Sequence, residues 1–298
     1  MVAAYLAELF DTHRTRLLGL GYRLTGSIRT AEDAVQESLL RLNGVHQSEI
    51  DDFGDWLTGA VAAICADHLV AAQRAAAAAQ RLPDPLVTPL VSRGGGAWAE
   101  IARHRANRLP TLVALTALTP AQRLAAVLPE LPVERIAAWL DLELDAAERA
   151  AVIGRAAATA LPDPATEPEH EAAVRRLLTA LRSRARAAVR DGHEPDRGTG
   201  EVASGLHTQA QALAATADGP VVTEGQERVA ERLLALAAEH GIGCPDADPA
   251  GCYEFVGVNG ELGLLLRGPE VDRVLGFAVR ADAVWRVFDI PAPAPGWG

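Results

Sequence analysis

The sequence contains no lysine, so all 28 of its basic residues are arginines. They stand against 39 aspartates and glutamates in 298 residues, which gives a formal net charge of −11. A protein that binds nucleic acid through its own affinity usually carries a basic patch or a basic domain. The acidic balance therefore argues against a chain whose main activity is charge-driven binding to DNA or RNA.

Cysteine and aromatic residues are also scarce. Three cysteines are too few for a disulfide framework, and aromatics make up 4% of a chain that is 49% hydrophobic. No apolar run approaches the ~20 residues that span a bilayer, and acidic residues begin too early for a signal peptide, at Glu8 and Asp11. We expect a protein of the reducing cytoplasm with no membrane partner. Abundant alanine favours helices.

Residues 30–42, TAEDAVQESLLRL, are the most clearly helical segment. Thr30 is the expected N-cap, with Asp33 as its acidic partner three residues on. One face is an apolar stripe at helical spacing, formed by Ala31, Ala34, Val35, Leu39 and Leu42. A second face carries Asp33, Gln36, Glu37 and Leu40. From periodicity alone, that second face is a solvated surface with one exposed leucine.

The remaining pattern divides the chain into four parts. Helices at 3–18 and 53–73, joined to the 30–42 helix, predict a three-helix bundle over 1–75, in which Gly19 and Gly21 interrupt or kink the first helix and Cys65 is a core residue. Prolines and a triple glycine predict a linker over 76–108. Thr119 and Pro120 start a helix within a helix-turn-helix module over 109–163, whose last helix is 146–161.

Residues 164–298 predict an α+β domain. A long arginine-rich helix at 169–190 and a loop at 191–205 precede a helix at 226–240. A meander follows, with strands at 253–258, 262–267, 274–280 and 284–290. Asn259-Gly260 is the strongest short hairpin signal in the chain.

The run LFDTHRTRLLGLGYRLTGSIRTAEDAVQESLLRL, residues 9–42, resembles region 2 of bacterial extracytoplasmic-function (ECF) sigma factors. RLPDPL at 81–86 resembles a W-L-P-E-P-L linker motif of one ECF subgroup, with Arg81 and Asp84 as departures. Members of that subgroup carry an extra SnoaL-like, cone-shaped α+β domain. The resemblance implies a mainly α protein with a region 2 bundle, a helix-turn-helix region 4 module and a SnoaL-like C-terminal domain.

The resemblance also implies two partners. In the family, the helix that matches 30–42 docks on the β′ clamp helices of core RNA polymerase, which assigns that contact to Asp33, Gln36, Glu37 and Leu40. Promoter DNA is the second partner, and its candidate contacts are Arg74, Arg149 and Arg155. In the family, the C-terminal domain contacts the sigma modules and tunes activity, so a regulatory protein or a small ligand at that domain is a further partner class.

The segments that would face DNA are short of cations. Residues 1–80 hold six arginines against ten carboxylates, and residues 110–165 hold four against seven. Because phosphate contacts and counterion release supply most non-specific DNA affinity, promoter reading is expected to be weakened. Asp141 stands where the family's turn has a glycine, and Arg149 has an alternative role as an ion-pair partner of Asp145.

Catalytic and metal sites are not expected. His207, Tyr253 and Asp289 are the best candidates for a titratable set in a C-terminal cavity, but surface or core-edge roles fit them better. A five-residue set could be read as a metal loop, or as a disulfide between its two cysteines, although it matches no known zinc spacing. That set is His240, Cys244, Asp246, Asp248 and Cys252. We expect no catalytic residue, metal or cofactor.

Three functions therefore compete. The first is an ECF-type sigma factor that binds core polymerase, with a C-terminal domain that modulates its activity. The second is a degenerate sigma-like protein that has lost promoter recognition and serves as a protein- or ligand-binding regulatory module. The third is an enzyme or small-molecule binder that uses the SnoaL-like cavity.

Overall fold

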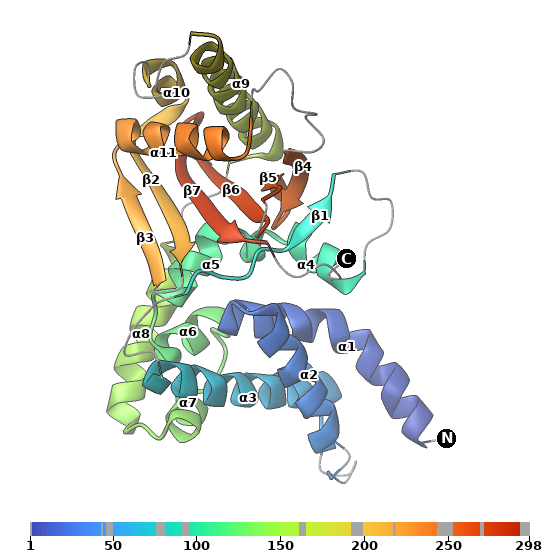
Figure 1. Cartoon of the computed structure of the whole chain (residues 1–298). Helices are drawn as coiled ribbons and strands as arrows, with labels where there is room; N and C mark the ends of the chain where they lie inside the picture. Colours follow the sequence, from blue (N-terminus) through green and yellow to red (C-terminus); the bar gives the residue numbers. More distant parts are fainter. Residues whose placement is uncertain are drawn as a thin grey trace. The chain divides into compact units, whose positions relative to one another are not determined.

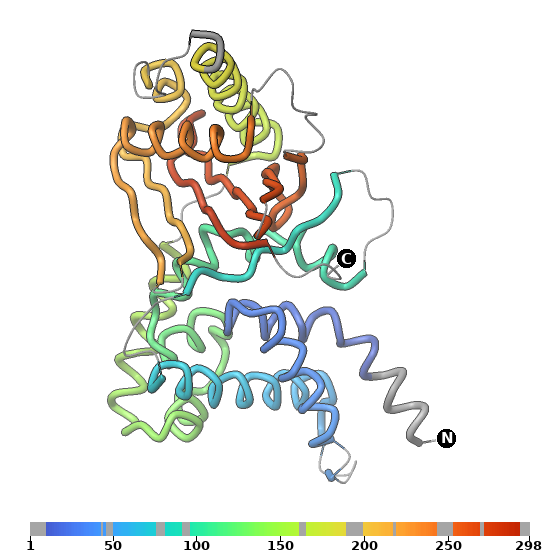
Figure 2. The backbone as a smooth tube through the Cα atoms, viewed as in Figure 1, coloured from blue at the N-terminus to red at the C-terminus, as the bar shows by residue number. Residues whose placement is uncertain are grey.

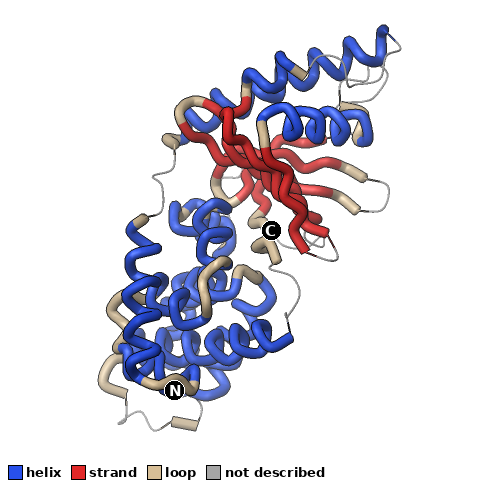
Figure 3. The backbone as a smooth tube through the Cα atoms, turned by 90° about the vertical axis from the view of Figure 1, so that its left-hand side faces the viewer, coloured by secondary structure: helices blue, strands red, loops and turns tan. Residues whose placement is uncertain are grey.

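The computed structural model describes residues 2–42, 44–45, 50–75, 81–90, 96–160, 165–191, 199–216, 219–242, 253–268 and 271–292. The chain divides into two compact units, the first formed by Met1–Asp84 with Gly95–Pro162, and the second by Pro85–Gly94 with Asp163–Gly298. The first unit is helical, and the second combines helices with a seven-stranded sheet (Figures 1 and 3). The predicted fold class, mainly α with an α+β C-terminal domain, is confirmed.

Three helices begin the first unit: α1 (Val2–Thr25), α2 (Ile28–Leu42) and α3 (Phe53–Ala75). Each packs against the other two, as the predicted bundle requires (Figure 2). The expected interruption of α1 at Gly19 and Gly21 is wrong, because the helix runs through both. Gly21 instead permits close packing, since a Cβ there would lie 3.0 Å from the Cα of Ala31 in α2.

Helix α2 begins two residues earlier than predicted, so Thr30 is not its N-cap. The backbone N–H of Ile28 donates to the Asp84 carboxylate at 2.9 Å, and that of Thr30 donates to the Ser27 hydroxyl at 3.4 Å. A carboxylate at a helix N-terminus satisfies an otherwise unpaired N–H and complements the positive end of the helix dipole. The capping residue is 56 residues away in the sequence, so the local sequence around α2 could not predict it.

Helix α3 is, within the described ranges, the one helix whose length and composition would suit a membrane span. It lies in the bundle, and its side chains at Leu57, Val61 and Ile64 are buried. Cys65 is buried beside them, and this burial raises the pKa of its thiol to about 12. These are the properties of a core helix, and Cys65 has the predicted core position.

Six further elements complete the first unit: α4 (Ala97–Arg103), the 3₁₀ helix η2 (Arg105–Asn107), α5 (Leu109–Thr116), α6 (Pro120–Val127), α7 (Val133–Leu140) and α8 (Leu144–Thr159). The predicted cap of α6 is confirmed as a capping box between Thr119 and Gln122. Part of the segment predicted as a linker is helical, and the Trp98 indole N–H of α4 donates to Glu32 of α2 at 3.0 Å. Residues 76–80 and 91–95 of that segment lie outside the described residues.

The turn between α7 and α8 is made without glycine. Asp141 caps α7 in the left-handed conformation, with φ of 51°. Helix α8 then begins at Leu144, and it buries Ala147, Ala151 and Gly154. A Cβ at Gly154 would overlap the carbonyl oxygen of Gln122 in α6, so these two helices cross with their backbones in near contact.

The second unit is built on one mixed sheet in the order β1-β4-β5-β6-β7-β2-β3. Its strands are β1 (Val87–Pro89), β2 (Leu206–Thr216), β3 (Gly219–Glu224), β4 (Tyr253–Val258), β5 (Glu261–Leu266), β6 (Arg273–Arg280) and β7 (Ala283–Pro291). All neighbours are antiparallel except β2 and β7. The helices are α9 (Glu167–Asp191), α10 (Gly200–Ser204) and α11 (Gln226–Glu239). Helices α9 and α11 lie on one face of the sheet (Figure 3), over a core that includes Leu177, Leu233, Phe277 and Val287.

The last four strands and the hairpin at Asn259-Gly260 are confirmed, with positive φ at both turn residues, 51° and 79°. That pairing of positive φ values suits a two-residue hairpin turn. Strands β2 and β3 were not expected, and α10 lies in the predicted loop. The β2 sequence, LHTQAQALAAT, is rich in alanine and reads locally as a helix former, so its pairing with β7 and β3 determines its conformation.

Candidate functional site

The outward face of α2 carries the residues predicted to bind polymerase. Its inward face buries Ala31, Ala34 and Val35, so the helix is fixed in rotation. Asp33, Gln36 and Leu40 are consequently exposed, Leu40 by 64%, and Glu37 is half-buried. The structure places all four predicted side chains on one continuous surface, which we call the α2 face.

The carboxylates of the α2 face are paired within the helix. Glu37 accepts from Arg41 at 2.6 Å, and Asp33 lies 4.0 Å from Arg29. Exposed pairs at this i, i+4 spacing contribute about 0.3–0.5 kcal/mol, so they orient the side chains weakly and can exchange partners. An exposed leucine bordered by exchangeable carboxylates can make both apolar and charged contacts with a protein.

Asp84 is held at the base of α2 by three hydrogen bonds. Its carboxylate accepts from Ile28, its N–H donates to the Gly26 carbonyl at 2.8 Å, and its own carbonyl accepts from the Tyr22 hydroxyl. Tyr22 is fully buried. Asp84 is therefore a built-in part of the α1–α2 turn, although the sequence suggested only that it lies in a linker motif.

Two residues later the chain is anchored in the second unit. The Leu86 N–H donates to the side-chain oxygen of Asn259 at 3.0 Å, and the Asn259 N–H donates to the Leu86 carbonyl at 2.8 Å. Val87 then begins β1, which pairs with β4. Asn259 and Leu86 are both buried. The hairpin turn that the sequence predicted thus binds, through two hydrogen bonds, the segment that leads out of the first unit.

The arginines of the helix-turn-helix segment are mostly occupied by the protein itself. Arg123 is buried and donates to the carbonyls of Leu24, Thr116 and Leu118. Burial lowers the pKa of Arg123 to about 10, so it stays charged at neutral pH. Its role is to join α6 to the end of α1.

The other three arginines of that segment differ in availability. Arg135 stacks on Trp139, with its guanidinium carbon 4.9 Å from the ring centroid. Arg155, a predicted DNA contact, donates to the carbonyls of Pro129 at 2.9 Å and Leu131 at 3.2 Å, and so braces the loop before α7. Arg149, the other predicted contact on α8, is exposed, and the alternative ion pair with Asp145 does not form. Arg74 is exposed in the last turn of α3.

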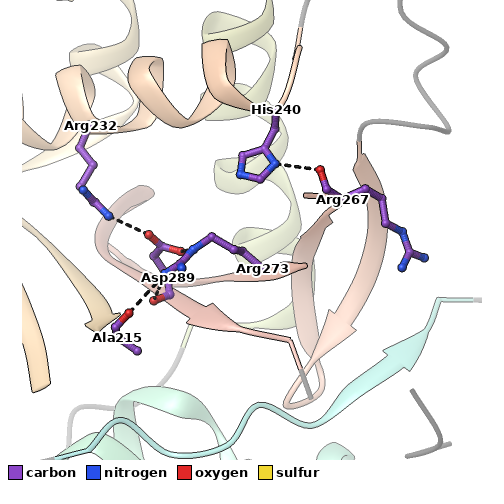
Figure 4. Close-up of polar contacts among 6 residues, drawn as sticks. All are labelled: Ala215, Arg232, His240, Arg267, Arg273 and Asp289. Atoms are coloured by element: carbon purple, nitrogen blue, oxygen red, sulfur yellow. Dashed lines mark hydrogen bonds and ion pairs between the residues drawn. The ribbon is translucent and has the colours of Figure 1, made fainter. Parts of the chain in front are cut away.

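A buried carboxylate with two arginines lies in the second unit (Figure 4). Asp289 of β7 is 1% exposed, and its oxygens accept from Arg232 of α11 at 2.9 Å and from Arg273 of β6. Arg273 also contacts the Ala215 carbonyl of β2. Both carboxylate oxygens are thereby used in holding α11, β6 and β7 together.

The three residues considered as a titratable set are not brought together. Tyr253 begins β4, and three strands, β5, β6 and β7, lie between it and the β2 strand that carries His207. Asp289 is in register with Ala214, seven residues along β2 from His207, which is roughly 20 Å in an extended strand. Tyr253 packs on Phe255 and lies beneath Arg182. This geometry offers no shared reaction site.

The predicted metal or disulfide loop lies mostly outside the described residues, since these stop at 242 and resume at 253. His240 is described, and its Nδ1 bonds to the Arg267 carbonyl at 2.9 Å (Figure 4). Among the residues whose placement is described, no three histidines, cysteines or carboxylates gather as metal ligands would.

This architecture matches that of known proteins. The sigma-70 region 2 family model matches residues 9–75, which are the first three helices. The chain is 32% identical to the ECF RNA polymerase sigma factor SigJ of Mycobacterium tuberculosis, over 95% of this chain and 91% of that protein. It is also 28% identical over 148 residues to a probable ECF RNA polymerase sigma factor, SigI, of the same species, over 44% of this chain and 47% of that protein.

The crystal structure of Mycobacterium tuberculosis SigJ matches with a TM-score of 0.71 and 27% identity, over 96% of both chains. A region 2 bundle with a helix-turn-helix segment and a SnoaL-like α+β unit defines the class of protein, a sigma-type transcription regulator. The chain belongs to the ECF RNA polymerase sigma factors. Membership in this family implies that the chain binds core RNA polymerase and promoter DNA.

Proposed function

We propose that the chain binds core RNA polymerase through the α2 face, with the β′ clamp helices as its docking partner. The observation that carries this proposal is the exposure of Leu40, by 64%, between the paired carboxylates of a rigidly packed helix. An exposed apolar side chain with a charged rim is the pattern of a protein contact. Family membership adds a partner to that pattern.

The test exchanges the apolar centre of the α2 face for charge. Leu40→Asp is expected to weaken binding to purified core polymerase by at least about tenfold, as loss of a central interface side chain does, without lowering the thermal stability of the protein. Val271→Asp, at another exposed apolar residue (54%), is the matched control and should bind normally. Equal polymerase affinities of the two variants in surface plasmon resonance would show that the α2 face does not contact the polymerase.

The second part of the proposal is that the C-terminal domain modulates polymerase binding through residues 84–86. Asp84 caps the helix that carries the α2 face, and Leu86 is clasped by Asn259 in the second unit. Only Pro85 separates the two anchors. Release of Leu86 therefore weakens the hold on Asp84, and a ligand or protein that loosens the hairpin around Asn259 would lower the affinity of α2 for polymerase.

This coupling predicts a measurable non-additivity. Asp84→Ala removes an N-cap that contributes about 1 kcal/mol to helix stability, so polymerase affinity is expected to fall by up to about fivefold, and the affinity of Asn259→Ala should fall in the same direction. Because both act on one anchor, the double variant should lose less than the product of the single losses. Strictly multiplicative losses, or unchanged binding in Asn259→Ala, would contradict the coupling.

A second candidate function is a sigma-like module with reduced promoter recognition. It is favoured by the use of Arg123 and Arg155 as internal braces and by the carboxylates around α8. Run-off transcription with reconstituted holoenzyme separates the two candidates, since this one predicts polymerase binding without a promoter-specific transcript. An enzyme in the second unit has less support, because Asp289 is held by two arginines and lies away from His207 and Tyr253.

A further inference from the structure

Helix α8 exposes large apolar side chains where a DNA-reading helix needs cations. Val152 is 67% exposed and Ile153 52%; Leu142, in the turn before the helix, and Leu144, its first residue, are 39% and 44% exposed. These are four of the nine exposed large hydrophobic residues in the described part of the chain. Two adjacent large apolar side chains that are both this exposed on one helix mark an interaction surface more often than a scattered single residue does.

The packing of α8 against α6 fixes the orientation of the helix about its own axis, so the exposed side chains cannot turn inward. Ala147, Ala151 and Gly154, at i, i+4 and i+7, form a seam of small residues against α6. The overlap that any side chain at Gly154 would make with the Gln122 carbonyl fixes that seam inward. Val152 and Ile153 must consequently face away from the helix pair.

The composition of α8 points in the same direction. Seven of its sixteen residues are alanine, the strongest helix former. Valine and isoleucine are less favourable than alanine by roughly 0.5 kcal/mol each in a helix, and they gain nothing from burial at positions 152 and 153. A solvated helix surface would have no physical reason for these two β-branched residues.

The charge around this surface selects among partners. Over residues 141–154 the charged side chains are four exposed carboxylates, Asp141, Glu143, Asp145 and Glu148, and the exposed guanidinium of Arg149. Phosphate groups of DNA or of an anionic bilayer would be repelled. A second copy of the same surface would place like charges opposite one another, which is also unfavourable.

From this combination we propose that the outward face of α8, which we call the α8 surface, is a protein-docking site for a basic amphipathic helix. The apolar face of that helix would cover Val152 and Ile153, and its arginine or lysine side chains would meet Asp145 and Glu148. The site is distinct from the α2 face, so the chain would carry two protein-binding surfaces on its sigma-like unit.

The experiment uses the full chain and two fluorescent synthetic amphipathic helices with the same leucine face. One has arginines on its polar face and the other has glutamates. In fluorescence anisotropy the arginine helix is expected to bind and the glutamate helix is not. The double substitution Val152→Ser with Ile153→Ser should weaken binding of the arginine helix by at least about tenfold, the order expected when anchor side chains are removed.

The matched control is Val221→Ser with Val222→Ser, at two valines of β3 that are 53% and 51% exposed. It should bind the arginine helix like the unmodified protein. An equal loss in this control, or no binding of the arginine helix, would overturn the proposal. The proposal would also be overturned if the α8 substitutions lowered the affinity of the protein for duplex DNA. It would likewise be overturned if sedimentation showed a dimer that those substitutions dissociate. Circular dichroism checks that each variant keeps its helix content.

Discussion

Asp289→Ala is expected to destabilise the second unit by about 3 kcal/mol. Removing one partner of a buried ion pair typically costs 3–5 kcal/mol, because the remaining charge is left uncompensated. Here the partners Arg232 and Arg273 keep 37% and 23% of their side chains exposed, so water can recover part of the loss. The lower end of that range is therefore the expected value.

Hydrogen exchange read by mass spectrometry is the appropriate measurement, because it reports β6 and β7 separately from the helical unit. Exchange in these strands should accelerate by about two orders of magnitude, since each 1.4 kcal/mol is a factor of ten. Asp289→Asn keeps the side-chain shape and one acceptor oxygen, so its exchange rate in these strands should lie between those of the unmodified protein and Asp289→Ala. Glu231→Ala, at an exposed carboxylate beside Arg232 on α11, should be neutral. Equal exchange in Asp289→Ala and Glu231→Ala would refute a role for Asp289 in holding the strands.

Gly154→Val is expected to destabilise the helix-turn-helix segment by about 3 kcal/mol. Overpacking typically costs 1–3 kcal/mol, and here the clash is with the backbone carbonyl of Gln122, which cannot rotate away as a side chain would. The α6–α8 crossing must then open by the width of the added atoms. That opening would also remove Arg155 from the loop that it braces.

The measurement is thermal unfolding together with hydrogen exchange in α6 and α8. Ala156→Val places the same side chain on the exposed side of the same helix and should change stability by only a few tenths of a kcal/mol, through helix propensity alone. Similar melting of the two variants would mean that α6 and α8 are not in the close contact described.

The sequence pattern correctly predicted those elements that are determined by interactions between residues close together in the chain. The α2 stripe, the Thr119 capping box and the Asn259-Gly260 turn each depend on residues within one or two turns of chain, and each is observed. The start of α2 was misplaced because its cap, Asp84, is 56 residues away. Strand β2 was missed because its alanines favour a helix, and only neighbouring strands hold it extended.

The candidate sites divide in the same manner. The four residues of the α2 face could be grouped from spacing, because helical periodicity places them on one side. The count of arginines predicted a shortage of DNA contacts, but not that Arg123 and Arg155 would be used to bind carbonyls. The α8 surface was also missed, although its Val152-Ile153 pair within an alanine-rich helix was a signal that could have revealed it.

The pairing of β1 with β4 has a consequence for deletion experiments. Cutting away residues 164–298 would remove β4 and Asn259 while leaving β1 and the buried Leu86 attached to the shortened chain. The backbone N–H and carbonyl of Leu86 would then lose their hydrogen bonds to Asn259, and the buried Leu86 side chain would be exposed to water. A fall in the activity of such a shortened protein could arise from this damage at residues 84–89 and would resemble loss of a regulatory domain. Point substitutions at Asn259 avoid that confusion, because Asn259 lies in the turn after β4 and its replacement leaves β4 in place beside β1.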